Sequence, residues 1–197
     1  RDQPRSRGLG DVYKRQREMD YSQFGIVYAG LQKNLGTSGT GLAVVREDLL
    51  GHALPETPKL LDYALFDEHN SIPNTINVFA VYVMRLVLEW VKEQGGVPEM
   101  EKLAKKKSSL LYEILDNSVL YSSVAHPKHR SITNVTFHLP QEKLLQKFLT
   151  ETEKEGLFAL KGHAAVGGAR ASIYNAMPLE GVDALAQFMK EFERKNG

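Results

Sequence analysis

Two adjacent glycines, Gly95-Gly96, follow a long helical pattern and limit how this 197-residue chain can fold. Before them, apolar residues recur at steps of three and four positions, at Phe79, Tyr82, Val83, Leu86, Val87, Trp90 and Val91. That spacing predicts an amphipathic helix that begins near Ile76, and the glycine pair ends it. We therefore expect two domains, residues 17–95 and 96–197, with their boundary at the glycines.

Residues 96–197 alternate between helical and strand patterns. A helix is predicted from an apolar stripe with Lys105-Lys106-Lys107 on its solvent side. The stripe consists of Met100, Leu103, Leu110, Leu111, Ile114 and Leu115. Half-buried strands are predicted at residues 131–139 and 170–176, and amphipathic helices at 142–155 and 181–196. This order indicates an α+β domain in which helices pack on a small sheet.

Residues 17–95 begin with two apolar runs, Phe24–Gly30 and Leu42–Val45, which a Gly/Ser/Thr-rich turn at Gly36–Gly41 separates. Short apolar runs bounded by turn residues predict buried strands. The alternation of strand and helix in this part suggests the end of a parallel α/β sheet. Residues 52–75 contain three prolines and are expected to be irregular. A loop of that length is usually functional or disordered.

Composition excludes several classes of function. The chain has 25 basic and 24 acidic side chains, so its net charge of +1 gives no strong field to attract nucleic acid or an acidic membrane. The absence of cysteine excludes disulfides, thiolate metal sites and cysteine nucleophiles, and it fits a reducing cytoplasm. The six histidines show no spacing typical of metal ligands, and no apolar run is long enough to span a membrane. We therefore expect a cytoplasmic protein with no metal site and no nucleic-acid or membrane partner.

Residues 1–16 are basic and polar and show no periodicity. They lack the apolar core of a signal peptide. One interpretation is a basic arm that binds nucleic acid. We expect instead an artefactual or disordered tail that lies outside the fold.

Lys33 lies just past the first predicted strand. A side chain at a strand end can project into a cleft from a rigid support. An amine shielded from water there is more readily deprotonated, which makes it nucleophilic towards a carbonyl carbon. The alternative is a solvated surface charge, which is the commoner role of a lysine. Lys33 is therefore a candidate catalytic residue.

Three segments together resemble the phosphoserine aminotransferase family. Phe24–Asn34 resembles the family's cofactor-lysine segment, and Asn74-Thr75 resembles its Asn-Thr pair. Leu160–His163 with Gly167–Pro178 is similar to its substrate-carboxylate segment. The order and spacing of the three segments also agree, and the resemblance covers roughly residues 17–197.

This resemblance implies an α/β chain that is the C-terminal part of a type I aminotransferase fold, namely the end of the large-domain sheet plus a small α+β domain. It implies the cofactor pyridoxal 5'-phosphate and transfer of an amino group between L-glutamate and 3-phosphohydroxypyruvate. The products would be 2-oxoglutarate and phosphoserine, for serine biosynthesis and in many bacteria also for pyridoxine synthesis. Lys33 would hold the cofactor aldehyde as an imine and later carry a proton between the substrate α-carbon and the cofactor.

The resemblance also implies binding roles for other residues. Asn74 and Thr75 would bind the cofactor phosphate of the neighbouring subunit, which implies a homodimer. Their alternative role is to cap the helix expected near Ile76, for which Thr75 is well suited, and both roles could hold at once. Arg170 would grip the substrate α-carboxylate with its planar guanidinium, whereas its alternative role is to pair with a surface acid. His163 would help to bind the substrate phosphate, or it is a structural histidine. Glutamate and phosphoserine are the implied small-molecule substrates.

Two departures from the family bear on this function. The family usually has an arginine directly after the histidine that aligns with His163, and this chain has Ala164. Loss of one charge-assisted contact to a phosphate costs on the order of 1.5–3 kcal/mol, which weakens binding of phosphorylated substrates. In addition, the family's acidic partner for the pyridine nitrogen, its ring-stacking aromatic residue and most of its phosphate cup precede the lysine segment. This chain has none of that region, so we expect the chain alone to be inactive.

Other functions stay open at this point. Ala164 favours a related type I aminotransferase that acts on a non-phosphorylated amino acid. A non-catalytic interaction domain would suit residues 96–197, but it gives Lys33, Asn74-Thr75 and Arg170 no shared role. A cysteine desulfurase is excluded because its chemistry needs a cysteine.

Overall fold

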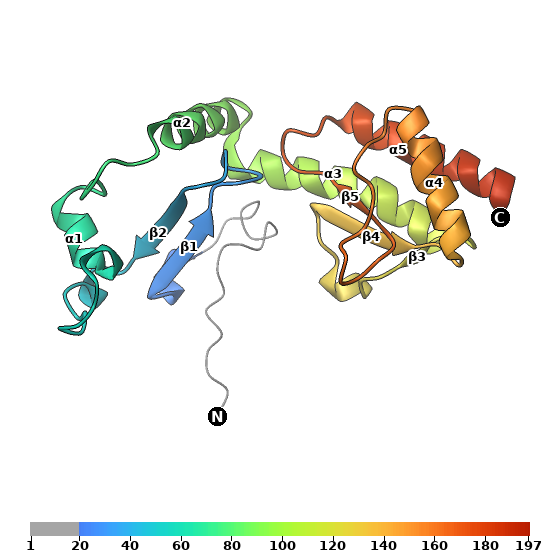
Figure 1. The fold of residues 1–197 in the computed structure, drawn as a ribbon. Helices are drawn as coiled ribbons and strands as arrows, with labels where there is room; N and C mark the ends of the chain where they lie inside the picture. The colour runs from blue at the N-terminus through green and yellow to red at the C-terminus, as the bar shows by residue number, and fades with distance from the viewer. Residues whose placement is uncertain (1–19) are drawn as a thin grey trace. The chain divides into compact units, whose positions relative to one another are not determined.

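The computed structural model describes residues 20–197, which form two compact units (Figure 1). The first unit ends at Val97, and the second unit is Pro98–Gly197. The expectation of a tail at residues 1–16 lies outside the described residues. Because each unit is compact, each can be described from its own elements.

The chain passes from the first unit to the second at the glycine pair. Helix α2 (Val78–Glu93) ends before the pair, and helix α3 (Gly96–Asn117) begins with its second glycine. Gly95 and Gly96 have φ angles of 97° and 77°. A Cβ atom would crowd the backbone in this left-handed conformation, so two glycines are suited to end α2.

The first unit contains a two-stranded sheet. Strands β1 (Ile26–Gly30) and β2 (Gly41–Val45) pair antiparallel, with Gly30 opposite Gly41. Both predicted strands are confirmed, but the predicted parallel arrangement is wrong for this pair. The reason is the connection, because residues 31–40 form only a turn. A parallel crossover needs a dozen or more residues, usually including a helix.

Both faces of this two-stranded sheet carry apolar side chains. Val27 and Ala29 are buried, whereas Leu42 and Val44, which pair with them, are exposed. On the opposite face Tyr28 is also exposed. Apolar residues on both faces are typical of strands in α/β sheets that are covered on both sides. The strand pair therefore has the sequence of a sheet interior.

Three short helical segments connect β2 to α2. Two are 3-10 turns, η3 (Glu47–Leu49) and η4 (Lys59–Leu61), and the third is helix α1 (Tyr63–Glu68). A further 3-10 turn, η2 (Tyr21–Gln23), precedes β1. The prediction of an irregular loop at residues 52–75 is therefore wrong where α1 forms. This helix has only 6 residues, which is too short for its periodicity to be recognised.

Helix α2 begins at Val78, later than predicted, because Asn77 is its cap. The Asn77 Oδ1 accepts a hydrogen bond from the Ala80 N–H at 3.1 Å, which satisfies one of the free donors of the first turn. The alternative role of Thr75 as the helix cap is therefore wrong. Thr75 is exposed and lies outside the helix.

The second unit combines a 3-stranded sheet with helices. Its helices are α3, α4 (Glu142–Lys154) and α5 (Leu179–Asn196), and its strands are β3 (Ser122–Ser123), β4 (Asn134–His138) and β5 (Ala169–Ser172). A 3-10 turn, η5 (Pro127–His129), precedes β4. The sheet order is β3-β4-β5, and both pairs are antiparallel. The predicted helices and strands of this unit are confirmed, and β3 is an addition.

One face of this sheet forms the core of the second unit. Along β4, Val135 and Phe137 are fully buried, and they alternate with Asn134, Thr136 and His138, which are half-buried. The buried side chains pack against residues of all three helices, including Leu111, Leu115, Phe148, Val182, Leu185 and Met189. The other face of the sheet is polar, and it lies outside this core.

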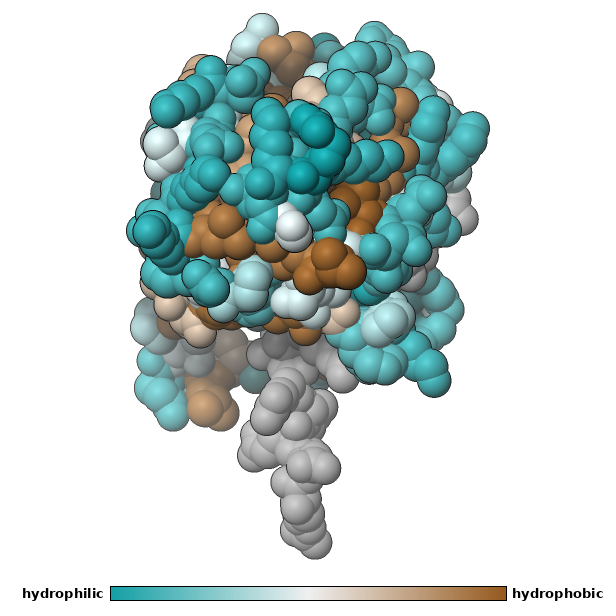
Figure 2. Space-filling view, turned by 90° about the vertical axis from the view of Figure 1, so that its right-hand side faces the viewer, coloured by the Kyte–Doolittle hydropathy of each residue, from teal (hydrophilic) through white to brown (hydrophobic). Residues whose placement is uncertain are grey.

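The surface of the second unit is mostly hydrophilic where α4 and α5 lie. Figure 2 shows teal side chains over most of that side, with apolar surface in patches between them. Two apolar side chains of this unit are strongly exposed, Phe158 at 70% and Val119 at 91%. Throughout residues 20–197, no helix combines the length and apolarity that crossing a bilayer requires.

Phe148 is the centre of the aromatic core, so its truncation should unfold this unit more easily. Its ring centroid lies 5.3 Å from that of Phe192, 5.5 Å from Phe188 and 5.7 Å from Phe137. We expect Phe148→Ala to lower the free energy of unfolding by about 3–5 kcal/mol because it leaves a cavity. Urea unfolding followed by circular dichroism measures this loss. The control Phe158→Ala, at an exposed position, should change it by less than about 0.5 kcal/mol; equal losses would contradict the prediction.

Candidate active site

Lys33 lies on the turn that follows β1. Leu31 is fully buried and anchors this turn, because its N–H donates to Thr40 O and its carbonyl accepts from Leu35 N, both at 3.1 Å. Beyond this anchor the Lys33 side chain is exposed. The structure thus places Lys33 just past a strand, as the sequence predicts, but only one face of that strand is buried. The expected shielding of its amine from water is not seen.

The backbone of Lys33 is strained, with φ at +83°. A residue with a Cβ atom pays roughly 1–2 kcal/mol for this left-handed conformation. Such residues persist only where the surrounding structure holds them, and they cluster at active sites and ligand-binding positions. The strain distinguishes Lys33 from an ordinary surface lysine and supports a functional role for its amine.

Asn74 and Thr75 lie between α1 and α2, in the same unit as Lys33. Two residues with left-handed backbones, Asn70 (φ 49°) and Ser71 (φ 69°), end α1 and redirect the chain towards them. Both Asn74 and Thr75 are exposed, and Asn74 Nδ2 donates to Thr75 O at 3.1 Å. An amide and a hydroxyl can both donate hydrogen bonds to phosphate oxygens. Their exposure is compatible with binding a phosphate group.

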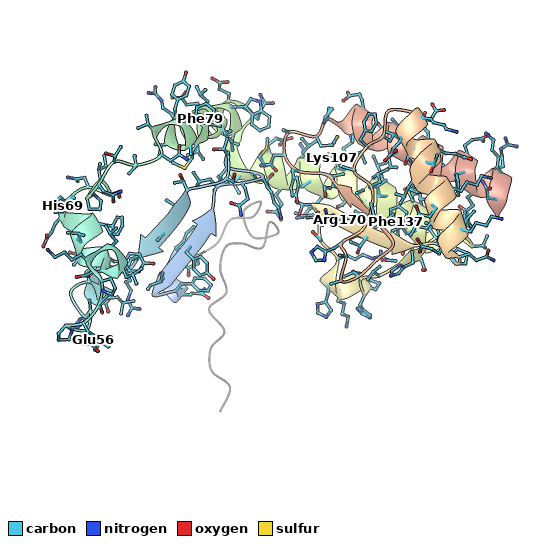
Figure 3. The ribbon with its side chains drawn as sticks, viewed as in Figure 1. Glu56, His69, Phe79, Lys107, Phe137 and Arg170 are labelled. Atoms are coloured by element: carbon cyan, nitrogen blue, oxygen red, sulfur yellow. The ribbon has the colours of Figure 1, made fainter. Side chains whose placement is uncertain are left out.

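Arg170, labelled in Figure 3, lies on the polar face of the second unit's sheet. It is opposite Thr136 of β4, and its backbone N–H donates to Leu160 O at 2.7 Å. The side chain is half-buried, and within residues 20–197 its buried Nε has no hydrogen-bond partner and no acid forms an ion pair with it. The alternative pairing with a surface acid is therefore not seen. A buried donor without a partner is costly, so this guanidinium is suited to an anionic ligand.

His163 begins a tight loop that leads into β5. The Gly162 N–H donates to Gly168 O at 2.8 Å and closes the loop. The Ala165 N–H donates to His163 Nδ1 at 3.2 Å, so Nε2 carries the proton of the neutral ring. Since the ring is exposed, that N–H can donate to a ligand.

The predicted site residues fall into two groups. Lys33, Asn74 and Thr75 belong to the first unit, whereas His163 and Arg170 belong to the second. Within the second unit, His163 lies on the loop that leads into β5, and Arg170 lies on β5 itself. Across residues 20–197, no cluster of three or more histidine, aspartate or glutamate side chains could hold a metal ion.

Sequence reasoning misplaced one polar residue. The prediction that Lys105-Lys106-Lys107 is a solvated face is wrong for Lys107, which is fully buried. The spacing contained the correct signal, because Lys107 lies between Ala104 and Leu111 in the buried stripe of α3. A charged residue within an apolar stripe indicates a buried charge with specific partners.

The partners of Lys107 are backbone carbonyls of the turn after β5. Its Nζ donates to Tyr174 O at 2.7 Å and to Met177 O at 3.0 Å. Figure 3 shows Lys107 on α3 and Arg170 in the same unit. The two hydrogen bonds fix the turn that follows the strand of Arg170. Lys107 therefore helps to hold that strand in place.

Comparison with known proteins identifies the family. The model of the class-V aminotransferase family matches residues 14–185. The matched residues include Lys33, the Asn74-Thr75 pair and Arg170. The chain belongs to the class-V aminotransferase family.

Within this family the chain is similar to phosphoserine aminotransferases. It is 50% identical to that of Bacillus cereus over 177 residues, which are 90% of this chain and 49% of the relative. The solved phosphoserine aminotransferase of Bacillus circulans subsp. alkalophilus matches with a TM-score of 0.91 and 42% identity, over 97% of this chain and 52% of that one. The pyridoxal-phosphate-bound enzyme of Trichomonas vaginalis matches with a TM-score of 0.82 and 35% identity, over 87% and 49%.

The chain therefore spans about half the length of the curated relatives it matches. The predicted α/β fold of a type I aminotransferase is confirmed over the part that this chain spans.

The buried amine of Lys107 should give the stability of the chain an unusual pH dependence. Burial lowers the pKa of Lys107 to about 8, whereas an unfolded lysine titrates near about 10.4. Between these values the unfolded chain binds more protons than the folded chain, so the free energy of unfolding rises with pH. We expect the unsubstituted chain to gain stability relative to Lys107→Met between about pH 8 and pH 10.

Urea unfolding at several pH values measures this difference. Lys106→Met, at an exposed neighbouring position, is the control and should follow the pH dependence of the unsubstituted chain. A constant difference between the unsubstituted chain and Lys107→Met over this range would show that Lys107 keeps its proton.

Proposed function

We propose that this chain contributes the cofactor-binding lysine and the carboxylate-binding arginine of a phosphoserine aminotransferase that uses pyridoxal 5'-phosphate. The reaction exchanges an amino group between L-glutamate and 3-phosphohydroxypyruvate, giving 2-oxoglutarate and phosphoserine. The observation that carries the proposal is the strained backbone of Lys33 just past strand β1. The similarity to phosphoserine aminotransferases over 90% of the chain supports the substrate class.

Lys33 fits the covalent attachment of an aldehyde cofactor. Its side chain is exposed on a turn that the buried Leu31 anchors, so a carbonyl group can approach it while the backbone stays fixed. Bound pyridoxal phosphate supplies an electron sink for bond cleavage at the substrate α-carbon. The Lys33 amine would accept and return the proton of that carbon.

Asn74 and Thr75 fit the role of phosphate ligands in a homodimer. Their exposed side chains can donate hydrogen bonds to the cofactor phosphate of a neighbouring subunit. Thr75 is not used as a helix cap, since Asn77 takes that role. Two identical chains would then each complete the cofactor site of the other.

Arg170 and His163 fit the substrate. The half-buried guanidinium of Arg170, which no described acid neutralises, suits the α-carboxylate that glutamate and phosphoserine share. The free N–H of His163 suits the substrate phosphate. A substrate with these two groups would be held at both ends.

Ala164 supports a second candidate function, transamination of a non-phosphorylated amino acid. Its methyl side chain is exposed in the loop where the resemblance places an arginine. One charge-assisted contact to a phosphate is therefore absent from this loop. The relative affinity for phosphoserine and serine distinguishes the two functions.

Reductive labelling tests the role of Lys33. The chain is incubated with pyridoxal phosphate, reduced with borohydride and digested, and the labelled lysines are identified by mass spectrometry. We expect the label on Lys33 to exceed that on the exposed Lys59, and Lys33→Ala to abolish the main adduct. Lys59→Ala should leave it unchanged. Equal labelling of the two lysines in the unsubstituted chain would reject the proposed role of Lys33.

Ligand titration tests the role of Arg170. Arg170→Lys keeps the charge but loses the planar two-pronged contact to a carboxylate. We expect it to weaken binding of phosphoserine and of serine by about tenfold or more, since a hydrogen bond to a charged group is worth about 1.5–3 kcal/mol. Titrations monitored by NMR give both dissociation constants. Arg194→Lys, at an exposed position on α5, is the control, and unchanged affinities in Arg170→Lys would contradict the proposal.

A further inference from the structure

His138 lies on the same sheet face as Arg170. Side chains alternate along β4, and the pairing of Thr136 with Arg170 places both on the polar face. His138 lies two residues beyond Thr136, so its side chain belongs to this face as well. Diagonal neighbours on paired strands have Cα atoms about 7–8 Å apart, within reach of two long side chains. The imidazole and the guanidinium can therefore contact the same small ligand.

His138 also lies at the base of the loop that carries His163. A Cβ atom at Gly168 would be only 2.6 Å from His138 Nδ1 and 2.5 Å from Phe137 O. The imidazole therefore covers the glycine that closes the loop with Gly162. This places His138 between the strand of Arg170 and the loop of His163.

Three other polar side chains of this face bond to one another. The hydroxyl groups of Ser172 and Tyr174 both donate to Asn134 Oδ1, at 3.1 and 3.4 Å. By contrast, the described residues give the His138 ring no hydrogen-bond or ion-pair partner, and Arg170 Nε likewise has none. Two adjacent basic side chains whose donors are left free favour an anionic ligand.

We propose that His138 is a specificity-determining residue that binds the distal anionic group of an amino-acid substrate, either a phosphate or a carboxylate. The α-carboxylate of the same substrate lies on Arg170, so this inference rests on the proposed function of Arg170. The imidazole N–H donates to the distal anion and supplements His163. His138 thereby supplies a donor to a site whose loop has Ala164 in place of an arginine.

The test compares acidic ligands with their neutral counterparts in the 197-residue chain. Dissociation constants are measured by NMR titration for phosphoserine and serine, and for glutamate and glutamine. The first pair reports recognition of a phosphate and the second recognition of a carboxylate. The variants are His138→Phe, which keeps an aromatic ring of similar shape, and His138→Arg, which restores a cationic donor. His129→Phe, at an exposed position in η5, is the matched control.

We expect His138→Phe to lower the preference for the acidic ligand by about tenfold in at least one pair, with little change for the neutral ligands. His138→Arg should keep the preference, and His129→Phe should not alter it. An unchanged preference in His138→Phe, or no preference in the unsubstituted chain, would overturn the role of His138. Failure of Arg170→Lys to weaken any of the four ligands would instead overturn the proposed function.

Discussion

The antiparallel pairing of β4 and β5 is the interaction on which the second unit depends. Its register sorts the side chains of both strands into two sets. Val135 and Phe137 enter the core, while Thr136 and Arg170 share the polar face. A slip of one residue would exchange the two faces, burying a guanidinium and exposing aromatic surface. The core packing therefore fixes the position of the candidate substrate arginine.

Lys107 extends this constraint beyond the end of the strand. A buried amine is tolerated when hydrogen bonds offset its loss of water, and two carbonyl oxygens of the turn after β5 accept from Lys107. Without the amine each carbonyl would lose one hydrogen bond, and Tyr174 O would keep the one from the Met177 N–H. Helix α3 is thus joined to the strand of Arg170 by a polar contact inside an apolar core. The position of this strand is specified both by packing and by hydrogen bonds.

Much of the fold follows from the spacing of apolar residues. The helices α2 to α5 and the strand β4 were predicted from the period of their apolar residues, and β1 and β2 from short apolar runs bounded by turn residues. The direction of pairing in the first unit was not, since it depends on the short connection between the strands. Helix α1 is too short to show a period, and Lys107 was misread because it was grouped with its charged neighbours in sequence.

The candidate site shows a different balance between sequence and structure. Lys33 was selected from its place after a strand and from resemblance, and Asn74, Thr75, His163 and Arg170 from resemblance alone. In the structure Arg170 is half-buried and the other four are exposed. The strain at Lys33, the unpaired Nε of Arg170 and the place of His138 are properties of backbone conformation and register. The sequence alone shows neither the backbone conformation nor the register. Ala164 was visible in the sequence, but the position of His138 beside Arg170 on the polar face was not.

The left-handed backbone of Lys33 lowers the stability of the fold at a position where the side chain has a proposed chemical role. Glycine would adopt the same conformation without a crowded Cβ atom. A lysine there gives up roughly 1–2 kcal/mol, a noticeable fraction of the about 5–15 kcal/mol that stabilises a typical domain. A chain optimised for stability alone would have glycine at this turn. The proposed role of its amine gives a reason for lysine at this position, a trade-off known for active sites in general.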